Sequence, residues 1–422
     1  MKPKPKGGFF QDRNTIMNLS FQRKVDRIAG TIICRILSLL YSKHDDRATQ
    51  IRPQRILVIL LSEMGSLVLA QPMFDHLKQK YPTASLFVLL FEQNKEVLDV
   101  LKVVSEENIL TVRNTSLRAL LEDSIRALRM MRKIGIDTVL DCELFSRISS
   151  IYAFLSGAKI RVGFDPYTQE GLYRGDFINR PVLYNPYQHI SHQFITLVEA
   201  VEAAGLPMVK RSVFNDALGV QPVEVDQDEI RGMAARINGD FPHITGKQVV
   251  LIYAGGGLLP IRAWPLSYFC VITEDLIEQG YIVGIIGMER DKEIARVIIS
   301  HCKSPNCIDL TGYTKSVREL MLLFHLASLL ITNDGGPGHF AAMTPISAII
   351  FYGPETPTLY GTLDDKSVNF YSRLSCSPCL TAYNHRNSSC DGNNLCLKAI
   401  HPETVLKKAY EILNSQKGLP VE

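Results

Sequence analysis

Apolar and polar residues follow two repeating patterns along this chain. Short apolar runs have the length and composition of strands buried on both faces of a sheet. Longer stretches place apolar residues three or four positions apart, as in amphipathic helices. The predicted strands are 55–61, 85–91, 138–141, 160–163, 248–253, 281–286, 307–310, 326–331 and 346–352. The predicted helices are 66–81, 117–134, 147–155, 189–204, 266–279, 291–301, 316–327 and one that starts near Pro337.

Alternating strands and helices are typical of doubly wound parallel sheets. The alternation occurs twice, on either side of a weakly periodic stretch at 206–227. We therefore predict an α/β protein with two Rossmann-like domains that face a crevice, where the carboxyl ends of the strands bind ligands. The predicted parts are a basic extension with an amphipathic helix (1–50), an acceptor-side domain (51–215), a linker region (216–245) and a nucleotide-sugar-binding domain with a cysteine-rich loop (246–422).

The N-terminal stretch 22–41 has its own pattern. Its apolar residues have helical spacing, and Arg23, Lys24 and Arg27 fall largely on the other face. A basic amphipathic helix of this kind either packs on the body of a protein or attaches to an anionic membrane surface. Both hypotheses stay open at the level of sequence.

Composition narrows the function classes. The chain has 422 residues, of which 46% are hydrophobic and 21% charged, as in globular proteins with more than one domain. The net charge of +3 comes without a long basic stripe, so we expect no nucleic-acid partner. We find neither an uninterrupted apolar run of membrane-spanning length nor a secretory signal. We therefore expect a cytoplasmic protein, with peripheral contact to the inner membrane through 22–41 as a hypothesis.

The segment around Asp334 suits an anionic ligand. An apolar run ends at Asp334, passes Gly335 and Gly336, and restarts as a helix at Pro337. A helix that opens directly after a strand directs free N–H groups towards the sheet edge, where they can bind phosphate. Asp334 could accept hydrogen bonds from sugar hydroxyls, and His339 could face a phosphate. A tight strand–helix turn without a ligand is the alternative.

Three further turns carry candidate residues. Gly256 and Gly257 lie in a glycine run that precedes Arg262, and together they could bind phosphate oxygens. Asp291 or Glu289 follows a predicted strand, where Rossmann-type sites hold ribose hydroxyls. Either residue could instead cap a helix. In the first strand–helix turn, Glu63 is the only ionisable side chain, which makes it the candidate general base.

Four cysteines lie close together near the C-terminus: Cys376, Cys379, Cys390 and Cys396. A Cys-x-x-Cys pair with two later cysteines is compatible with structural zinc. Free thiols and disulfides are the alternatives. No predicted strand is followed by an Asp-x-Asp pair of the kind that holds a metal ion with a nucleotide sugar, so we expect no metal or other cofactor to be required.

The ordered set of motifs resembles glycosyltransferase family 9, the lipopolysaccharide heptosyltransferases with the two-domain GT-B fold. The resemblance extends over about 55–410 and is more specific than any single motif. The residues that carry it are 56–59, Met64-Gly65, 137–140, 155–158, 161–164, Arg262, Trp264-Pro265, 310–312, 333–337, His339, Ala341-Ala342, 351–354 and Pro357.

This resemblance implies an inverting transfer from a nucleotide-diphosphate sugar, typically ADP-heptose, to a lipid-linked or oligosaccharide acceptor. It places Arg262 at a phosphate-binding position, and Ser66 where the family has its catalytic Asp. A serine needs an activating partner to act as a base, so we expect Glu63 to substitute for that Asp. Gly335 stands where the family has Ser or Thr.

Two alternatives to a transferase remain. One is an accessory protein that binds nucleotide sugar without catalysis, which Ser66 keeps open. The other is a nucleotide-sugar epimerase, which would turn over the donor without an acceptor.

Overall fold

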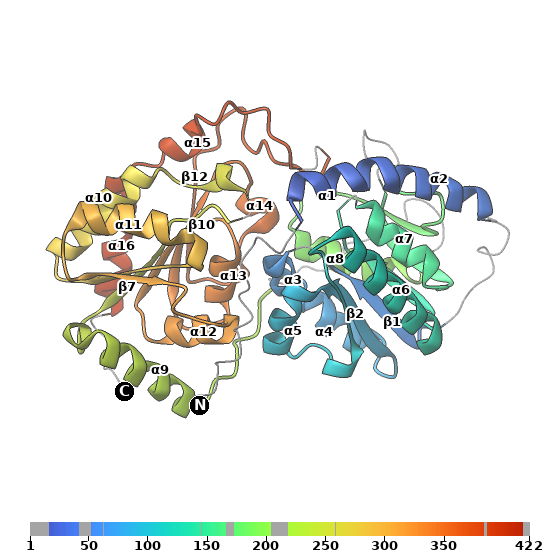
Figure 1. Cartoon of the computed structure of the whole chain (residues 1–422), viewed down its shortest axis with the longest axis horizontal. Helices are drawn as coiled ribbons and strands as arrows, with labels where there is room; N and C mark the ends of the chain where they lie inside the picture. The colour runs from blue at the N-terminus through green and yellow to red at the C-terminus, as the bar shows by residue number, and fades with distance from the viewer. Residues whose placement is uncertain are drawn as a thin grey trace. The chain divides into compact units, whose positions relative to one another are not determined.

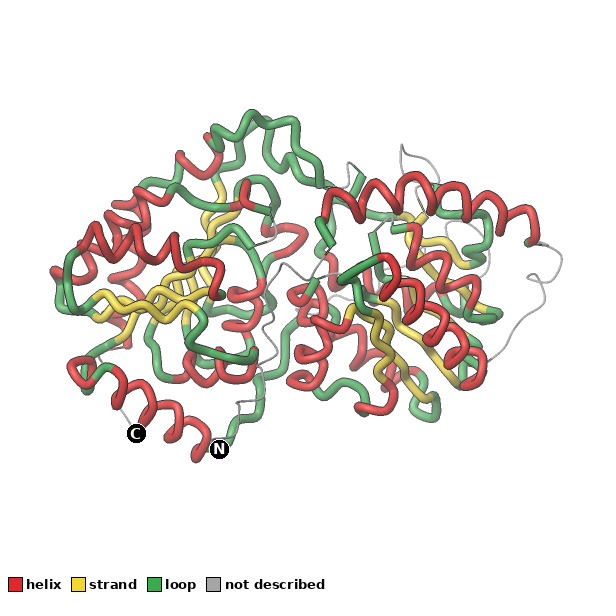
Figure 2. The backbone as a smooth tube through the Cα atoms, viewed as in Figure 1, coloured by secondary structure: helices red, strands yellow, loops and turns green. Residues whose placement is uncertain are grey.

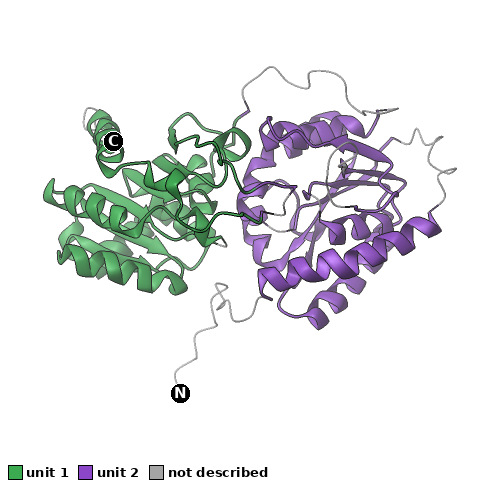
Figure 3. Cartoon of the chain, turned by 90° about the horizontal axis from the view of Figure 1, so that it is seen from above, with its two compact units in different colours: residues 1–12, 219–380, 387–422 green, residues 13–218, 381–386 purple. Residues whose placement is uncertain are grey.

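The computed structural model describes residues 17–41, 52–61, 63–144, 146–165, 173–203, 218–257, 259–383 and 386–416. These residues form two compact units, which Figure 3 shows in different colours. The amino-terminal unit contains the described residues up to Leu218 together with Thr381–Arg386. The carboxy-terminal unit contains Gly219–Leu380 and the described residues from Asn387 onwards.

The amino-terminal unit is built on a six-stranded parallel sheet in the order β3-β2-β1-β4-β5-β6. Its central strands are almost entirely apolar, because helices cover both faces of the sheet. The strands are β1 (Arg55–Ile59), β2 (Ser85–Phe91), β3 (Ile109–Val112), β4 (Thr138–Asp141), β5 (Ile160–Asp165) and β6 (Arg180–Leu183).

The helices of this unit include the predicted ones, whereas three short helices between residues 92 and 108 were not predicted. The helix predicted at 66–81 is two helices, since the first ends at Leu69 and the second starts at Gln71 with Pro72 in its first turn. The helices are α3 (Met64–Leu69), α4 (Gln71–Lys80), η4 (Glu92–Asn94), α5 (Lys95–Leu101), η5 (Glu106–Asn108), α6 (Leu117–Ile134), α7 (Arg147–Leu155) and α8 (Ile190–Ala200).

The predicted N-terminal helix is present and packs on α7. It runs through α1 (Leu19–Val25), a π-helical turn η2 (Asp26–Gly30) and α2 (Thr31–Leu40) without leaving helical geometry (Figure 1). Among the described residues, no helix combines the length and hydropathy needed to cross a membrane.

The carboxy-terminal unit has a second six-stranded parallel sheet, in the order β12-β11-β10-β7-β8-β9. The strand predicted to be last, 346–352, is followed by β12, which lies at the edge of the sheet. The strands are β7 (Val249–Tyr253), β8 (Ile282–Gly287), β9 (Cys307–Thr311), β10 (Leu329–Asn333), β11 (Ser347–Tyr352) and β12 (Ser367–Tyr371).

Helices surround this second sheet, and a long irregular loop separates β12 from α15 (Figure 2). The stretch 216–245, predicted to be a linker region, contains the helix α9. The helices are α9 (Gln227–Asp240), η6 (Pro242–Ile244), η7 (Pro260–Arg262), α10 (Leu266–Glu278), η8 (Glu289–Asp291), α11 (Lys292–Cys302), α12 (Val317–His325), α13 (Gly336–Ala342), α14 (Pro357–Tyr360), α15 (Leu395–Lys398) and α16 (Pro402–Gln416).

Candidate active site

The strand order of the carboxy-terminal unit creates a switch point between β7 and β10. These strands are neighbours, but β7 is followed by β8 on one side and β10 by β11 on the other. Right-handed crossovers then place α10 and α13 on opposite faces of the sheet, which leaves an opening at the carboxyl ends of β7 and β10. The packing agrees, because α10 contacts α11 and α16 whereas α13 contacts α12.

Asn333, the last residue of β10, ties the two loops at this opening together. Its side-chain Oδ1 accepts a hydrogen bond from the Trp264 backbone N–H at 2.8 Å. Its Nδ2 donates to the Ala254 and Gly255 carbonyls at 3.1 and 3.0 Å. The side chain is fully buried, so the amide fixes the position of the β7–α10 loop relative to β10.

The glycines of the two loops differ in what surrounds them. A Cβ at Gly256 would lie 2.8 Å from Pro260 Cα, and Gly257 has a φ of +61°, so the fold itself requires glycine at both positions. Gly335 has extended backbone, and a Cβ there would meet no atom closer than 4.0 Å. A Cβ at Gly336 would be in ordinary contact with Phe340 at 3.4 Å. The space in front of Gly335 is therefore open.

Three buried charged side chains meet beside these loops. Arg262 Nη2 donates to Glu355 Oε1 at 2.9 Å, and Arg262 Nε lies 3.7 Å from Asp334 Oδ2. Within the described part of the chain, Arg262 Nε and Asp334 Oδ2 have no hydrogen-bond partner. The two atoms face each other beyond hydrogen-bond distance, an arrangement that a ligand with both donors and acceptors could complete.

The protonation of this cluster is set by its burial. Burial raises the pKa of Glu355 to about 7, against the smaller lowering effect of Arg262. Burial also raises the pKa of Asp334. For Arg262, burial alone would lower the pKa, but the combined charges of Glu355 and Asp334 raise it above its usual value. The guanidinium therefore stays charged, while Glu355 changes charge near neutral pH.

His339 is buried in α13, three residues after the first residue of that helix. Arg262 thus lies in the loop that follows β7, and Asp334, Gly335, Gly336 and His339 lie in the turn and helix that follow β10. Their roles towards a ligand stay predictions.

Asp291 and Glu289 have different surroundings after β8. Asp291 Oδ2 accepts a hydrogen bond from the Met288 backbone N–H at 2.9 Å, which closes the turn η8 at the start of α11. Asp291 is buried, whereas Glu289 is exposed and pairs with Lys292. A Cβ at Gly312, just after β9, would lie 2.6 Å from Glu289 Oε2. The carboxylate of Asp291 therefore acts as a cap, the alternative considered above, and Glu289 is the more accessible of the two.

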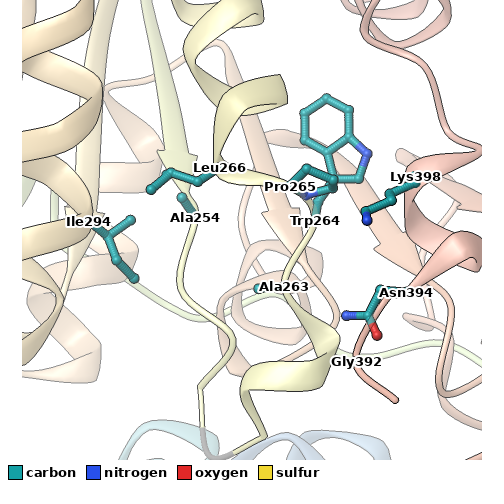
Figure 4. A pocket seen from close by; sticks show the side chains of 9 residues that line it. All are labelled: Ala254, Ala263, Trp264, Pro265, Leu266, Ile294, Gly392, Asn394 and Lys398. Atoms are coloured by element: carbon teal, nitrogen blue, oxygen red, sulfur yellow. The ribbon is translucent and has the colours of Figure 1, made fainter. Parts of the chain in front are cut away.

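A pocket of about 290 Å³ lies next to the β7–α10 loop (Figure 4). Its wall is mostly apolar, with the polar ends of Asn394 and Lys398 on one side. Asn394 Nδ2 donates to the Ile261 carbonyl at 2.8 Å, which connects the loop before α15 to the residues around Arg262. The lining residues are Ala254, Ala263, Trp264, Pro265, Leu266, Ile294, Gly392, Asn394 and Lys398.

In the amino-terminal unit, Glu63 directly precedes α3, and Ser66 lies in the first turn of that helix. The Glu63 carboxylate is paired with Arg386. Burial, followed by the charge of Arg23, lowers the pKa of Arg386 to about 10. Glu63 therefore faces a cation that the sequence analysis did not identify.

Arg386 reaches Glu63 because a segment of the carboxy-terminal sequence belongs to the amino-terminal unit. In this segment, Thr381–Arg386, the Tyr383 ring packs edge-on against Tyr184 with centroids 5.4 Å apart. Tyr383 Oη also donates to the Tyr184 carbonyl at 3.4 Å. A local sequence pattern cannot predict this contact, since Arg386 and Glu63 are 323 positions apart.

A second carboxylate, Glu143, lies near the end of β4, and it was also not among the predicted site residues. Its Oε1 accepts a hydrogen bond from the Leu61 backbone N–H at 2.6 Å, and the side chain is buried. Because β1 and β4 are paired, Glu143 and Glu63 lie at the same edge of the sheet. The signal available in the sequence was a carboxylate shortly after a buried strand, which Glu143 shares with Glu355 after β11.

All nine cysteines lie within the described residues, and none of them forms a disulfide, so the disulfide alternative is not found. Cys379 Sγ accepts a hydrogen bond from Ser388 Oγ at 3.0 Å, and Cys396 is buried against Gly353. Among the residues that the structure describes, no group of three or more His, Cys, Asp or Glu side chains is arranged to hold a metal ion.

Comparisons with known proteins add to this geometry. The family model of glycosyltransferase family 9 (heptosyltransferase) matches residues 126–388, more than half of the chain. A lipopolysaccharide heptosyltransferase 2 from Salmonella typhimurium is 23% identical over 376 residues, which cover 86% of this chain and 99% of that protein.

Two solved structures share the fold. The Escherichia coli ADP-heptose lipopolysaccharide heptosyltransferase II matches with a TM-score of 0.67 and 19% identity, over 86% of this chain and 100% of that one. An E. coli heptosyltransferase solved with ADP matches with a TM-score of 0.57 and 15% identity, over 85% and 100% of the two chains.

Proposed function

This chain belongs to glycosyltransferase family 9 and is a glycosyltransferase, and from that premise we propose that it transfers a heptose-like sugar from a nucleotide diphosphate to a lipopolysaccharide-type acceptor. The observation that carries the proposal is the buried cluster of Arg262, Asp334 and Glu355 at the switch point of the carboxy-terminal unit. A cation beside an open Gly335 loop suits a diphosphate, and a carboxylate with an unused oxygen suits sugar hydroxyls.

The identities of donor and acceptor rest on the relatives. The similar proteins are heptosyltransferases of lipopolysaccharide, and one of the similar structures contains ADP. ADP-heptose is therefore the donor that we propose, and a lipid-linked core oligosaccharide is the proposed acceptor.

We propose that the reaction is a single displacement with inversion. A base in the amino-terminal unit takes the proton of an acceptor hydroxyl, whose oxygen then forms a bond to the anomeric carbon of the donor. The bond between that carbon and the phosphate oxygen breaks, and its electron pair leaves with the nucleotide diphosphate. Arg262 would stabilise the charge that develops on the diphosphate, because a buried cation interacts strongly with such a charge.

Glu63 is the proposed base. It lies in the first strand–helix turn, and its pairing with Arg386 favours the ionised form that a base requires. Ser66, one turn along α3, stands where the family has its catalytic Asp and would contact the acceptor without acting as the base. Arg386 would act through Glu63 as a positioning residue.

The remaining donor contacts are proposed by position. Gly335 and Gly336 would allow close approach of the diphosphate, and His339 would lie near it in α13. Glu289 replaces Asp291 as the residue proposed for the ribose hydroxyls, because the Asp291 carboxylate already closes its own turn. Gly256 and Gly257 shape the loop that carries Arg262.

A thermal-shift panel tests the donor site. ADP, UDP, GDP and ADP-heptose are compared with the wild-type protein and with the variants Arg262→Ala and Asp334→Ala. A ligand that binds only the folded state raises the melting temperature. At a ligand concentration about one hundred times Kd, it adds about 2.7 kcal/mol to the free energy of unfolding. We expect ADP and ADP-heptose to raise the melting temperature of the wild type, and we expect Arg262→Ala to abolish this effect. No shift with any nucleotide would overturn the proposed function.

Two alternative functions give different results in a turnover assay. An epimerase would convert the donor without an acceptor, and an accessory protein would bind the donor but never release ADP from it. We expect ADP-heptose to be consumed only when a heptose-deficient lipopolysaccharide is present.

The cysteine cluster carries a separate hypothesis, a structural zinc ion bound by Cys376, Cys379, Cys390 and Cys396. It is supported by the spacing of the Cys-x-x-Cys pair and the two later cysteines alone, since the four side chains are not grouped as metal ligands among the described residues. Zinc content is measured by mass spectrometry in protein purified without chelators, beside the variant Cys376→Ser/Cys379→Ser. One zinc per chain that the variant loses would support the hypothesis, and a metal-free wild type would dismiss it.

A further inference from the structure

The N-terminal helix (α1, η2 and α2) contacts the amino-terminal unit through polar and small residues. Asp26 accepts hydrogen bonds from the backbone N–H groups of Arg147 and Ile148 at 3.0 and 2.9 Å, so it caps the start of α7. It also lies 3.6 Å from Arg147 Nη1. Asp26 is the only acidic residue in 17–41, and these contacts turn it towards the protein.

We call this contact line the seam, and it continues from Asp26 at intervals of four residues through Gly30, Cys34 and Ser38. Gly30 lies so close to α7 that a Cβ would be 2.8 Å from Arg147 Cβ. Cys34 is fully buried. Ser38 Oγ accepts hydrogen bonds from the Asp176 backbone N–H and from Tyr173 Oη at 2.9 and 2.8 Å. The helix is thus fixed along its length by polar and small residues, with Val25 and Leu37 half-buried beside them, while most of its large apolar side chains are not used.

Those large side chains point to solvent instead. Ile28, Leu39 and Leu40 are 65%, 86% and 74% exposed. Burying such side chains normally stabilises a fold, so a face of this size left uncovered indicates an interaction surface. We call it the apolar face, and its residues are Phe21, Ile28, Ile32, Ile33, Ile36, Leu39 and Leu40.

The charges beside the apolar face have one sign. Lys24, Arg27 and Arg35 are exposed, and Arg23 is half-buried. Because Asp26 is engaged with α7, the surface of the helix presents apolar residues flanked by cations only. That combination complements an anionic lipid surface, where the apolar side chains enter the acyl region and the cations meet phosphate headgroups.

We propose that the apolar face docks the protein in the plane of an anionic bilayer surface, with the seam of Asp26, Gly30, Cys34 and Ser38 holding the helix on the amino-terminal unit. This inference goes beyond the proposed function, and it does not depend on it, because lipid binding is measured without substrates. A soluble partner protein is a weaker explanation, because binding to it would not require that all charges around the apolar residues are positive. A second copy of this chain would place the same cations next to each other, and their repulsion would oppose binding.

Vesicle sedimentation of the full-length chain tests the proposal. Vesicles contain phosphatidylcholine alone or a 7:3 mixture of phosphatidylcholine and phosphatidylglycerol. The test variant is Ile32→Ser/Ile36→Ser/Leu39→Ser, and the control is Val271→Ser/Val297→Ser, which changes exposed apolar residues of α10 and α11. Deleting the whole helix is less informative, because it would also remove the Asp26 cap and uncover Cys34.

We expect the wild type and the control to bind the mixed vesicles, and the triple variant to bind at least tenfold more weakly with an unchanged melting temperature. Lys24→Ser/Arg27→Ser/Arg35→Ser should weaken binding to the mixed vesicles only. Equal binding by wild type and triple variant, or no binding by the wild type, would overturn the proposal. Light scattering adds one more outcome: a dimer that the triple variant converts to a monomer would show that a second copy covers the apolar face, which also overturns it.

Discussion

At the scale of single residues, Arg262 interacts with two buried carboxylates, and under the proposed function a diphosphate would compete with them for its positive charge. With Asp334 counted as ionised, the cluster of Arg262, Asp334 and Glu355 has a net charge of −1 when Glu355 is ionised and is neutral when Glu355 is protonated. Burial places the pKa of Glu355 at about 7, so this change occurs close to neutral pH. A diphosphate should bind the neutral form better, because it then competes with one carboxylate fewer for Arg262.

We therefore expect donor affinity to fall as the pH rises from 6 to 8.5. The sign follows from linkage, since a ligand that binds the protonated form more tightly raises the pKa of Glu355. A rise of this pKa by one unit corresponds to about a tenfold loss of affinity between pH 6 and pH 8.5. The measurement is calorimetric titration with ADP-ribose, whose phosphates carry no proton that titrates in this range.

The matched variants are Glu355→Gln and Arg262→Ala. The first should make the affinity independent of pH, and the second should weaken binding at every pH. A pH dependence that persists unchanged in Glu355→Gln would assign the effect to another group.

Glu63 leads to a prediction about catalysis. Glu63→Gln should lower kcat by about 10²- to 10⁴-fold, the usual contribution of a general base, while nucleotide binding is unchanged. Ser66→Ala should have a much smaller effect. Glu143→Gln is the control, because its amide oxygen can still accept the Leu61 N–H hydrogen bond. Release of ADP in the presence of acceptor is measured, and a larger loss in Glu143→Gln than in Glu63→Gln would transfer the role of base to Glu143.

Arg386→Met separates positioning from structural support. Arg386 favours the ionised form of Glu63, so its removal should raise the pKa of the base and move the acid limb of the pH–rate profile to higher pH. A variant that loses activity equally at all pH values would indicate that Arg386 only holds the loop in place.

At the scale of elements, the two glycine loops of the proposed donor site should respond differently to a Gly→Ala substitution. Gly256→Ala forces a Cβ against the backbone of Pro260 and should destabilise the protein by about 1–3 kcal/mol, as overpacking does. Gly335→Ala meets no atom closer than 4.0 Å and should leave the melting temperature unchanged. Thermal denaturation of both variants checks this, and a drop for Gly335→Ala as large as for Gly256→Ala would show that the space in front of Gly335 is not open.

The elements also show what periodicity could and could not predict. Central strands and long amphipathic helices such as α6 and α10 were predicted because burial imposes a pattern on them. The edge strands β3, β6 and β12 were missed, since they are short and only partly buried. The helix α9 was also missed, because Met233 and Ile237 are the only residues that it buries.

At the scale of the whole molecule, the limit of sequence reasoning was distance along the chain. Glycines and charged residues in the turns after strands, such as Arg262 and Asp334, could be proposed because each strand end is a local signal. The partners Glu355 and Arg386 were not found, since Arg262–Glu355 spans 93 positions and Glu63–Arg386 spans 323. Their contacts depend on packing and topology, which leave little trace in local patterns.

Residues from both sides of the switch point form the proposed donor site. This arrangement leads to a prediction for hydrogen exchange in the full-length protein. ADP should slow amide exchange in the β7–α10 loop and in the β10–α13 loop together, because Arg262 and Asp334 come from different loops that meet through Asn333. Peptides from both loops are compared by mass spectrometry with and without ADP. In Arg262→Ala the protection should disappear from both loops. Protection confined to one loop in the wild type would mean that the nucleotide binds away from the switch point.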